Sequence, residues 1–252
     1  MILIETFFLP GDINMALDVE MGRLSFKLKE PILRIYTWEK MTLSIGRLQK
    51  ISDVDFESLK KFDVDCVRRP TGGRAVLHWD EVTYSVVFPR GTEEFSMKVV
   101  ELYRRISEIL AKAFKRLEAD VEFSGGAGWD PKNPSCFSSG ARYELKINGK
   151  KFVGSAQVRM RNFVLQHGSI MLKPDWNILS QVLSDHPSVD FLSRKAMGLS
   201  EVSSAKFRDI VDLVEESFDE FYKLRWMDYS EILDLLKISG ELRGDYSCQN
   251  SI

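Results

Sequence analysis

The chain has 252 residues, of which 44% are hydrophobic and 29% are charged, a composition typical of globular proteins rather than of disordered or fibrous ones. Thirty-five Lys and Arg residues against 37 Asp and Glu residues give a net charge of −2, which argues against a surface dominated by nucleic-acid contacts. No apolar run approaches the ~18 residues that a membrane-spanning helix needs, so a membrane is not an expected partner either. We therefore expect neither nucleic acid nor a membrane as a partner.

The cysteine content and the N-terminal segment indicate a cytoplasmic protein with reduced thiols. The first ten residues lack the basic start of a secretory signal and are typical of an opening strand. Cys66, Cys136 and Cys248 are far apart and form no CxxC pair, which argues against a disulfide framework or a structural zinc site. Cys66 falls inside a predicted strand and is expected in the core, whereas Cys248 is expected to be incidental.

The first third of the chain is predicted to contain one long helix and several short strands. The helix runs from Asp12 to about Leu28, with the side chain of Asp12 or Asn14 as its N-cap. We expect it to bury its apolar residues, Met15, Leu17, Val19, Met21 and Leu24, only in part. Alternating patterns predict strands at residues 31–38, 42–46, 64–69, 75–77 and 82–88, with a short helix at 55–62.

The clearest helix follows, capped by Ser96 and running to Leu117, because its apolar residues recur at spacings of three and four. Its apolar stripe comprises Val99, Val100, Tyr103, Ile106, Ile109, Leu110, Ala113, Phe114 and Leu117. Residues 124–142 form a Gly- and Pro-rich loop without periodic pattern, and such long loops are often functional. The Asn148-Gly149 turn then predicts a hairpin of residues 143–147 and 151–158.

From residue 162 onward the pattern predicts one more strand, followed by helices. The strand covers residues 162–171, and the helices cover 176–183, a short piece near Leu192, 203–224 and 229–236. Antiparallel strands with helices packed on one side predict an α+β fold. We expect a single domain over residues 1–246 and a frayed tail at 247–252.

The segment at residues 68–78, Arg-Arg-Pro-Thr-Gly-Gly-Arg-Ala-Val-Leu-His, is the strongest candidate for a functional turn. Both glycines can adopt positive φ and let a ligand approach the main chain, whose amides can bind anions or carbonyl oxygens. The alternative is a hairpin with solvated arginines. The segment matches neither GxxxxGK[ST] nor GxGxxG, so it does not indicate a nucleotide-binding fold.

Residues 68–85 closely resemble the signature of the lipoate/biotin protein-ligase and octanoyltransferase superfamily. Three other stretches agree in order: 14–18, 34–46 and 149–157, the last reading Gly-Lys-Lys-Phe-Val-Gly-Ser-Ala-Gln. This resemblance covers roughly residues 12–172. It implies an α+β fold with a mixed, largely antiparallel sheet and a tunnel for an octanoyl or lipoyl chain. It also implies that the glycine turn lines the tunnel and that Lys151 contacts the acyl carbonyl.

Within the superfamily, the chain is most similar to octanoyltransferases of the LipM type. Their acyl-carrying nucleophile is a cysteine in the loop that here holds Cys136. Biotin ligases carry a GRGRxGR-type loop, and ATP-dependent lipoate ligases usually read Gly-Gly-Gly-Ala-Val where this chain has Arg74 in the third position. An ATP-dependent lipoate ligase and a non-catalytic acyl-binding subunit remain as alternatives.

The resemblance therefore implies transfer of octanoate from octanoyl-acyl carrier protein to a lipoyl-domain lysine, through a Cys136 thioester. A free thiol with a pKa of ~8.5 is only a few per cent ionised near pH 7, so a neighbouring cation such as Lys151 would raise the thiolate fraction. The acceptor is the glycine-cleavage H protein or the acyltransferase subunit of a 2-oxoacid dehydrogenase. No cofactor is implied, and ATP and Mg enter only for the ligase alternative.

Besides the catalytic pair Cys136 and Lys151, several residues are candidates for substrate binding. They are Arg69, Thr71, Gly72, Gly73, Arg74, Ala75, His78, Gly154, Ser155, Ala156 and His167. Arg69 and Arg74 either face a carrier phosphopantetheine or brace the turn, and His167 either lines the pocket or satisfies a backbone partner. No histidine spacing matches a hydrolase triad or a metal site, so no metal is expected.

Overall fold

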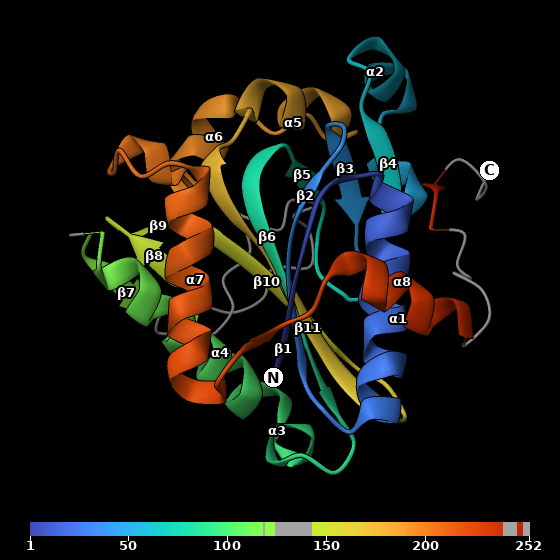
Figure 1. Ribbon diagram of the computed structural model, residues 1–252. Helices are drawn as coiled ribbons and strands as arrows, with labels where there is room; N and C mark the ends of the chain where they lie inside the picture. The colour runs from blue at the N-terminus through green and yellow to red at the C-terminus, as the bar shows by residue number, and fades with distance from the viewer. Residues whose placement is uncertain (118, 124–142, 239–245, 249–252) are drawn as a thin grey trace.

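A mixed six-stranded sheet forms the centre of the computed structural model, which describes residues 1–117, 119–123, 143–238 and 246–248 (Figure 1). The strand order is β10 (Val153–Arg159), β11 (Phe163–Lys173), β6 (Asp80–Pro89), β2 (Ile32–Trp38), β1 (Ile2–Leu9) and β12 (Arg225–Trp226). The pairs β10–β11, β11–β6 and β6–β2 are antiparallel, whereas β1 lies parallel to both β2 and β12. The expected α+β fold with a mixed, largely antiparallel sheet is confirmed.

Two small sheets flank the central one. The first has the order β4 (Asp65–Arg68), β3 (Thr42–Ile45) and β5 (Val76–His78), and the second has the order β7 (Val121–Phe123), β8 (Leu145–Ile147) and β9 (Lys150–Lys151). The predicted hairpin is therefore shorter than expected, because only β9 pairs with β8 across the Asn148-Gly149 turn. The chain changes sheets at Phe152, whose N–H donates to Leu145 and whose carbonyl accepts from Met171.

Helices cover both faces of the central sheet, so the expectation of helices on one side was wrong. Figure 1 shows α1 (Gly11–Leu28) and α8 (Tyr229–Ile238) on one face, and α4 (Val99–Lys115) and α7 (Phe207–Tyr222) on the other. Strand residues alternate between the two faces, and each face has its own buried apolar cluster. The shorter helices are α2 (Phe56–Lys61), α3 (Glu93–Ser96), α5 (Trp176–Val182) and α6 (Val189–Lys195), with single 3₁₀ turns at Ile51–Asp53 and Leu199–Glu201.

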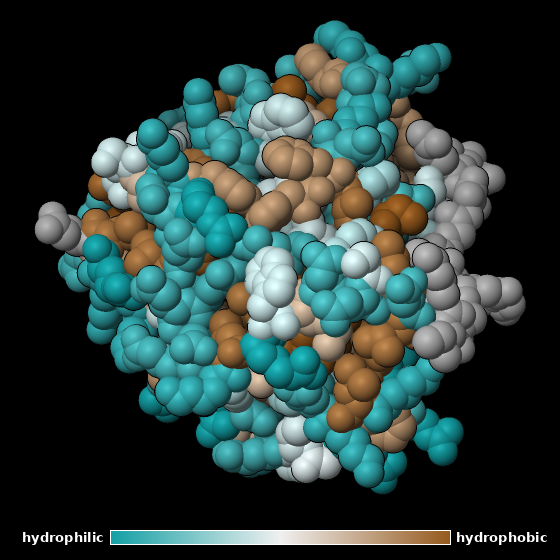
Figure 2. Space-filling model, in the orientation of Figure 1, coloured by the Kyte–Doolittle hydropathy of each residue, from teal (hydrophilic) through white to brown (hydrophobic). Residues whose placement is uncertain are grey.

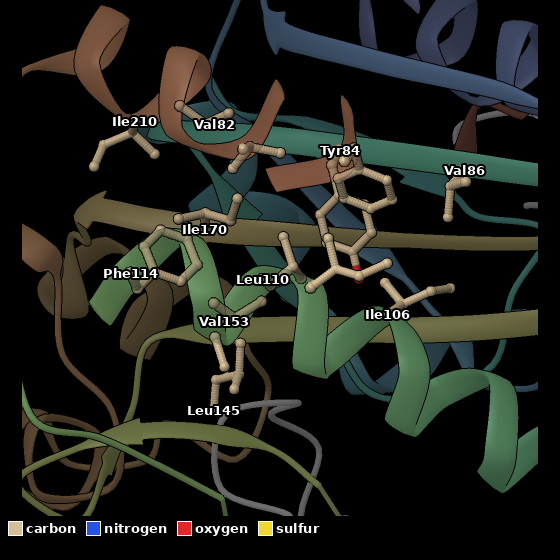
Figure 3. Close-up of a cluster of buried hydrophobic side chains, with 14 of the residues drawn as sticks. Val82, Tyr84, Val86, Ile106, Leu110, Phe114, Leu145, Val153, Ile170 and Ile210 are labelled. Atoms are coloured by element: carbon tan, nitrogen blue, oxygen red, sulfur yellow. The ribbon is translucent and has the colours of Figure 1, made fainter. Parts of the chain in front are cut away.

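The core under α4 follows the predicted stripe in most positions. Figure 3 shows Ile106, Leu110 and Phe114 of this helix directed toward Tyr84 and Ile170 of the sheet. The first turn departs from the prediction, because Val99 and Val100 are about half exposed. Ser96 does not cap this helix either. It ends α3, and the carboxylate of Glu101 instead accepts a hydrogen bond from the N–H of Lys98.

Helix α1 is far more buried than its sequence suggested. All five apolar residues expected to be half-buried, Met15, Leu17, Val19, Met21 and Leu24, are at most 5% exposed. The helix packs on the central sheet, is crossed by α8, and contacts Val67 of β4 near its N-terminal end, so it is covered on more than one side. Neither predicted N-cap acts as one: Pro10 precedes the helix, and the Asn14 amide donates to the carbonyls of Leu9 and Thr37.

The C-terminal residues that the structure describes are anchored rather than frayed. Ser247 forms an antiparallel bridge with Val67, and Cys248 is fully buried. The expectation of a frayed tail was wrong for these two residues, because the segment lies along the open edge of β4. Residues 249–252 fall outside the described part of the chain.

The surface is predominantly hydrophilic in the view of Figure 2, with apolar residues in small separate groups. None of the described helices is long and apolar enough to cross a membrane.

Candidate active site

The strand register places two rows of side chains on the α1 face of the central sheet. One row holds Ala156, His167, Ser85 and Arg34, and the next holds Gly154, Ser169, Thr83 and Tyr36. Residues two apart in a strand share a face, so both rows point the same way. This face is polar at its centre, unlike the apolar face under α4.

Asp18 of α1 is the centre of the first hydrogen-bond network. Its carboxylate accepts a 3.0 Å hydrogen bond from Arg34 Nη1 and a 3.1 Å bond from the hydroxyl of Tyr36, and it lies 2.8 Å from His167 Nδ1. The other ring nitrogen of His167 lies 2.7 Å from Thr71 Oγ1. Burial raises the pKa of Asp18, but the hydrogen bond with His167 and the charge of Arg34 outweigh it and hold that pKa below its ordinary value. His167 is therefore fixed between a carboxylate and a hydroxyl.

Glu81 of β6 is the centre of a second, parallel network. His78 Nδ1 lies 2.7 Å from the Glu81 carboxylate, and His78 Nε2 lies 2.7 Å from Ser44 Oγ. Thr83 and Ser169 donate hydrogen bonds to the same carboxylate. Burial raises the pKa of Glu81, and the charge and hydrogen bond of His78 more than offset this, so the pKa is lowered overall.

Two aromatic contacts complete this arrangement of polar side chains. Trp38 stacks on the His78 ring with centroids 4.0 Å apart, and its indole N–H donates to Thr83 at 2.9 Å. The guanidinium carbon of Arg34 lies 3.9 Å from the centroid of the Tyr36 ring. These contacts hold the rings of Trp38, His78 and Tyr36 in place at the pocket.

The glycine turn is held in place by Arg69, which is 5% exposed. Its guanidinium donates to the carbonyls of Ser44, Gly72 and Arg74. Arg69 therefore braces the turn, which was one of the two roles expected for it. Of the two glycines predicted to be free for positive φ, only Gly73 adopts it, at 94°.

A close backbone approach explains a glycine outside the turn. A Cβ at Gly46 would lie 2.0 Å from the carbonyl oxygen of Gly73. The N–H of Arg47 donates to the carbonyl of Thr71 at 2.8 Å, so β3 continues directly into contact with the turn. Only glycine at position 46 permits this approach.

A pocket with an empty volume of about 350 Å³, part of it open to solvent, lies between the polar face of the sheet and the glycine-turn region. Its lining includes six of the predicted binding residues: Arg69, His78, Gly154, Ser155, Ala156 and His167. The other predicted residues, Thr71, Gly72, Gly73, Arg74 and Ala75, belong to the turn itself and are not among the described lining residues. Thr71 reaches the pocket indirectly, through its hydrogen bond with His167.

The structure places Lys151 in a buried ion pair near the start of β10. Its ammonium donates to Glu144 Oε1 at 2.6 Å, and both side chains are about 3% exposed. Lys151 lies three residues before Gly154, which lines the pocket, but is not itself among the described lining residues. Cys136 lies outside the described residues, in the segment that joins Phe123 of β7 to Tyr143.

Several residues of the site were not identified from the sequence. They are Met15, Asp18, Arg34, Tyr36, Trp38, Ser44, Val76, Glu81, Thr83 and Ser169. Alternation along 34–38 and 81–85 places their polar residues on one strand face, but only the register shows that these faces meet. No group of three or more His, Cys, Asp or Glu side chains that could hold a metal ion occurs in the described part of the chain.

Comparison with known proteins agrees with this geometry. The family model described as the lipoyl protein ligase A/B catalytic domain matches residues 10–221. The chain belongs to this family. The matched range contains α1, the glycine turn, β10 and β11, and hence every described residue that lines the pocket.

Curated relatives of the family cover most of the chain. The octanoyltransferase LipM of Carboxydothermus hydrogenoformans is 36% identical over 228 residues, which are 86% of this chain and 84% of that protein. The octanoyltransferase LipM of Kyrpidia tusciae is 46% identical over 179 residues, or 68% of this chain and 65% of that protein. Together with the family model, these relatives identify the chain as an acyltransferase enzyme.

Solved structures support the fold. A lipoate-protein ligase A bound with ATP aligns with a TM-score of 0.78 at 21% identity, covering 97% of both chains. The bipartite lipoate protein ligase of Thermoplasma acidophilum, described with its E2 lipoyl domain, aligns with a TM-score of 0.76 at 19% identity, covering 97% of this chain and 94% of that one.

Proposed function

We propose that the chain transfers octanoate from octanoyl-acyl carrier protein to the lysine of a lipoyl domain, as a step of lipoate biosynthesis in the cytoplasm. One catalytic domain, residues 1–246, would carry the activity. The observation that carries the proposal is the joint lining of one pocket by the 68–78 and 154–169 segments, in a chain whose curated relatives are octanoyltransferases.

The pocket suits an acyl chain that ends in a polar carbonyl. Met15, Val76 and Trp38 offer apolar surface, whereas the polar groups of Arg69, His78 and His167 in the same wall are already hydrogen-bonded to neighbouring protein groups. Gly154 lines the wall without a side chain and leaves width for the acyl chain.

The proposed chemistry proceeds through two acyl transfers. The Cys136 thiolate attacks the carbonyl carbon of the octanoyl thioester, the carbon–sulfur bond to the carrier breaks, and the carrier leaves as a thiolate. The lysine amine of the acceptor then attacks the Cys136 thioester, loses a proton and forms the amide, which releases the Cys136 thiolate. The first step exchanges one thioester for another of nearly equal energy, so no ATP is consumed.

Lys151 is proposed to stabilise the oxyanion that develops on the acyl carbonyl in both steps. Glu144 holds its ammonium at one position, and a preorganised cation is worth more to a developing charge than one that must reorient. Lys151 ends β9, and β10, which begins two residues later, carries the Gly154–Ala156 wall of the pocket. The acceptor is the glycine-cleavage H protein or the acyltransferase subunit of a 2-oxoacid dehydrogenase.

Intact-protein mass spectrometry tests the proposal. Wild type, Cys136→Ser and the matched control Ser135→Ala are mixed with octanoyl-acyl carrier protein without ATP. Wild type and Ser135→Ala should each gain one octanoyl group and pass it to apo H protein, whereas Cys136→Ser should gain none.

Two results would overturn the proposal, each in favour of an alternative. Lipoylation that requires ATP and proceeds equally in Cys136→Ser would identify a lipoate ligase. Octanoate or lipoate binding without turnover, with any donor and with or without ATP, would identify a non-catalytic subunit.

A further inference from the structure

Two cysteines distant in sequence lie opposite each other across a short antiparallel pairing. Val67 of β4 bridges Ser247, and the N–H of Arg68 donates to the carbonyl of Tyr246 at 2.8 Å. This register makes Cys66 the direct partner of Cys248. Directly opposed residues of antiparallel strands have Cα atoms about 4.5–5.5 Å apart, which lies within the ~4.4–6.8 Å range of disulfides.

The two thiols also interact and differ in acidity. Both are buried, Cys66 at 5% and Cys248 at 0% exposure, and both are unoxidised. The interaction with Cys248, together with burial, raises the pKa of Cys66. The interaction with Cys66, helped by the charge of Arg68 and opposed by burial, lowers the pKa of Cys248.

We propose that Cys66 and Cys248 are a redox modification site, which a low-molecular-weight disulfide oxidises to an intramolecular disulfide. Cys66, which lines a cavity open to solvent, loses its proton and attacks one sulfur of the oxidant, which releases one thiol and leaves a mixed disulfide. Cys248 then loses its proton, attacks the Cys66 sulfur and releases the second thiol. Two protein thiols are oxidised by two electrons, and the oxidant is reduced to two thiols.

A cavity beside the pair gives the oxidant an approach. It has an empty volume of about 460 Å³, is open to solvent, and is lined by Cys66, Val67 and Ser247 together with Gly11 and Asp12. The oxidation of this pair does not involve Cys136, the nucleophile of the proposed function, so neither proposal depends on the other.

The disulfide would fasten the C-terminal segment behind the substrate pocket. Tyr246 packs against the buried cluster of Met15, Tyr36, Trp38 and Val67, and the first three of these line the pocket. A covalent bond at Cys248 holds Tyr246 against that cluster, because the two residues are two positions apart. The disulfide would therefore affect the residues of the pocket wall and would not contact a ligand inside the pocket.

Mass spectrometry of the full chain in the Cys136→Ser background isolates this pair, since only Cys66 and Cys248 then remain. Treatment with glutathione disulfide should lower the mass by about 2 Da and yield one linked peptide containing both residues after digestion. The added variants Cys66→Ala and Cys248→Ala should each abolish this loss. A stable glutathione adduct on either cysteine without the loss of mass would overturn the proposal.

A second measurement covers the case in which either alanine variant folds poorly. The oxidised and reduced forms of the Cys136→Ser protein are compared by thermal unfolding. The melting temperature of the oxidised form should rise by several degrees, because the disulfide closes a loop that spans most of the chain. An unchanged or lower melting temperature would mean that the bond forms only in a distorted geometry, against the cross-strand placement.

Discussion

Removing the charge of Asp18 should lower the free energy of unfolding by an amount that follows from its buried contacts. Asp18→Asn keeps the size of the side chain but removes the partner of Arg34, which is 1% exposed. An uncompensated buried charge costs about 3–5 kcal/mol, a large share of the roughly 5–15 kcal/mol that stabilises a folded protein. The variant should therefore unfold at a much lower urea concentration than wild type.

A double-mutant cycle separates the charge pair from the surrounding hydrogen bonds. Arg34→Met alone should destabilise by a similar amount, because it leaves the Asp18 carboxylate buried without its guanidinium partner, in contact with Tyr36 and His167. The double variant should lose less than the sum of the two single losses, by about 2–3 kcal/mol. Equilibrium urea unfolding of all four proteins gives these values. Additive losses, or a loss below about 1 kcal/mol for Asp18→Asn, would show that the Asp18–Arg34 pair does not stabilise the fold in this way.

The same carboxylate should control part of the acid sensitivity. Because the pKa of Asp18 is lowered on folding from its ordinary 3.8, its charged form stabilises the protein above that pH, and this contribution is lost as the pH falls below it. The stability difference between wild type and Asp18→Asn should therefore be complete near neutral pH and narrow below pH 3.8.

Two further predictions concern other parts of the molecule. Burial and then the neighbouring Glu5 raise the pKa of Glu215 to about 8, so the folded protein loses stability as the pH rises from 4.5 through 8. In melting curves from pH 5 to 9, the advantage of Glu215→Gln over wild type should grow with pH, and parallel curves would contradict this. Gly46→Ala should lower the unfolding free energy by about 1–3 kcal/mol, because its methyl group meets the Gly73 carbonyl. Gly72→Ala, whose Cβ meets nothing within 4 Å, should change it by less than about 0.5 kcal/mol, and equal losses in chemical denaturation would contradict the close approach.

Local patterns predicted the elements well but not what covers them. The recurrence of Ile106, Leu110 and Phe114 places α4 on an apolar core, and the structure agrees. The pattern of α1 was misleading, since its polar residues Asn14 and Asp18 are buried rather than solvated. They are buried because the sheet face beneath them is itself polar, and no property of the helix alone reveals that.

For the pocket too, local sequence patterns identified some residues but not the contacts between them. Arg69, His78 and His167 were singled out because they fall within motifs, and all three line the pocket. Glu81 and Ser44, which hold His78 between them, lay within the stretches that resemble the family but were not singled out. The contact between Ser44 and His78 depends on the pairing of β3 with β5, segments more than thirty residues apart, which periodicity does not encode.

The way the two pocket histidines are held has a consequence for their reactivity. Each ring has both nitrogens engaged, one by a carboxylate and one by a hydroxyl. A metal ion or an electrophile would have to break one of these buried bonds to reach a lone pair, whereas the His186 side chain is 56% exposed. The two imidazoles therefore shape the wall of the pocket, and neither ring has a free lone pair with which to attack or coordinate a bound group.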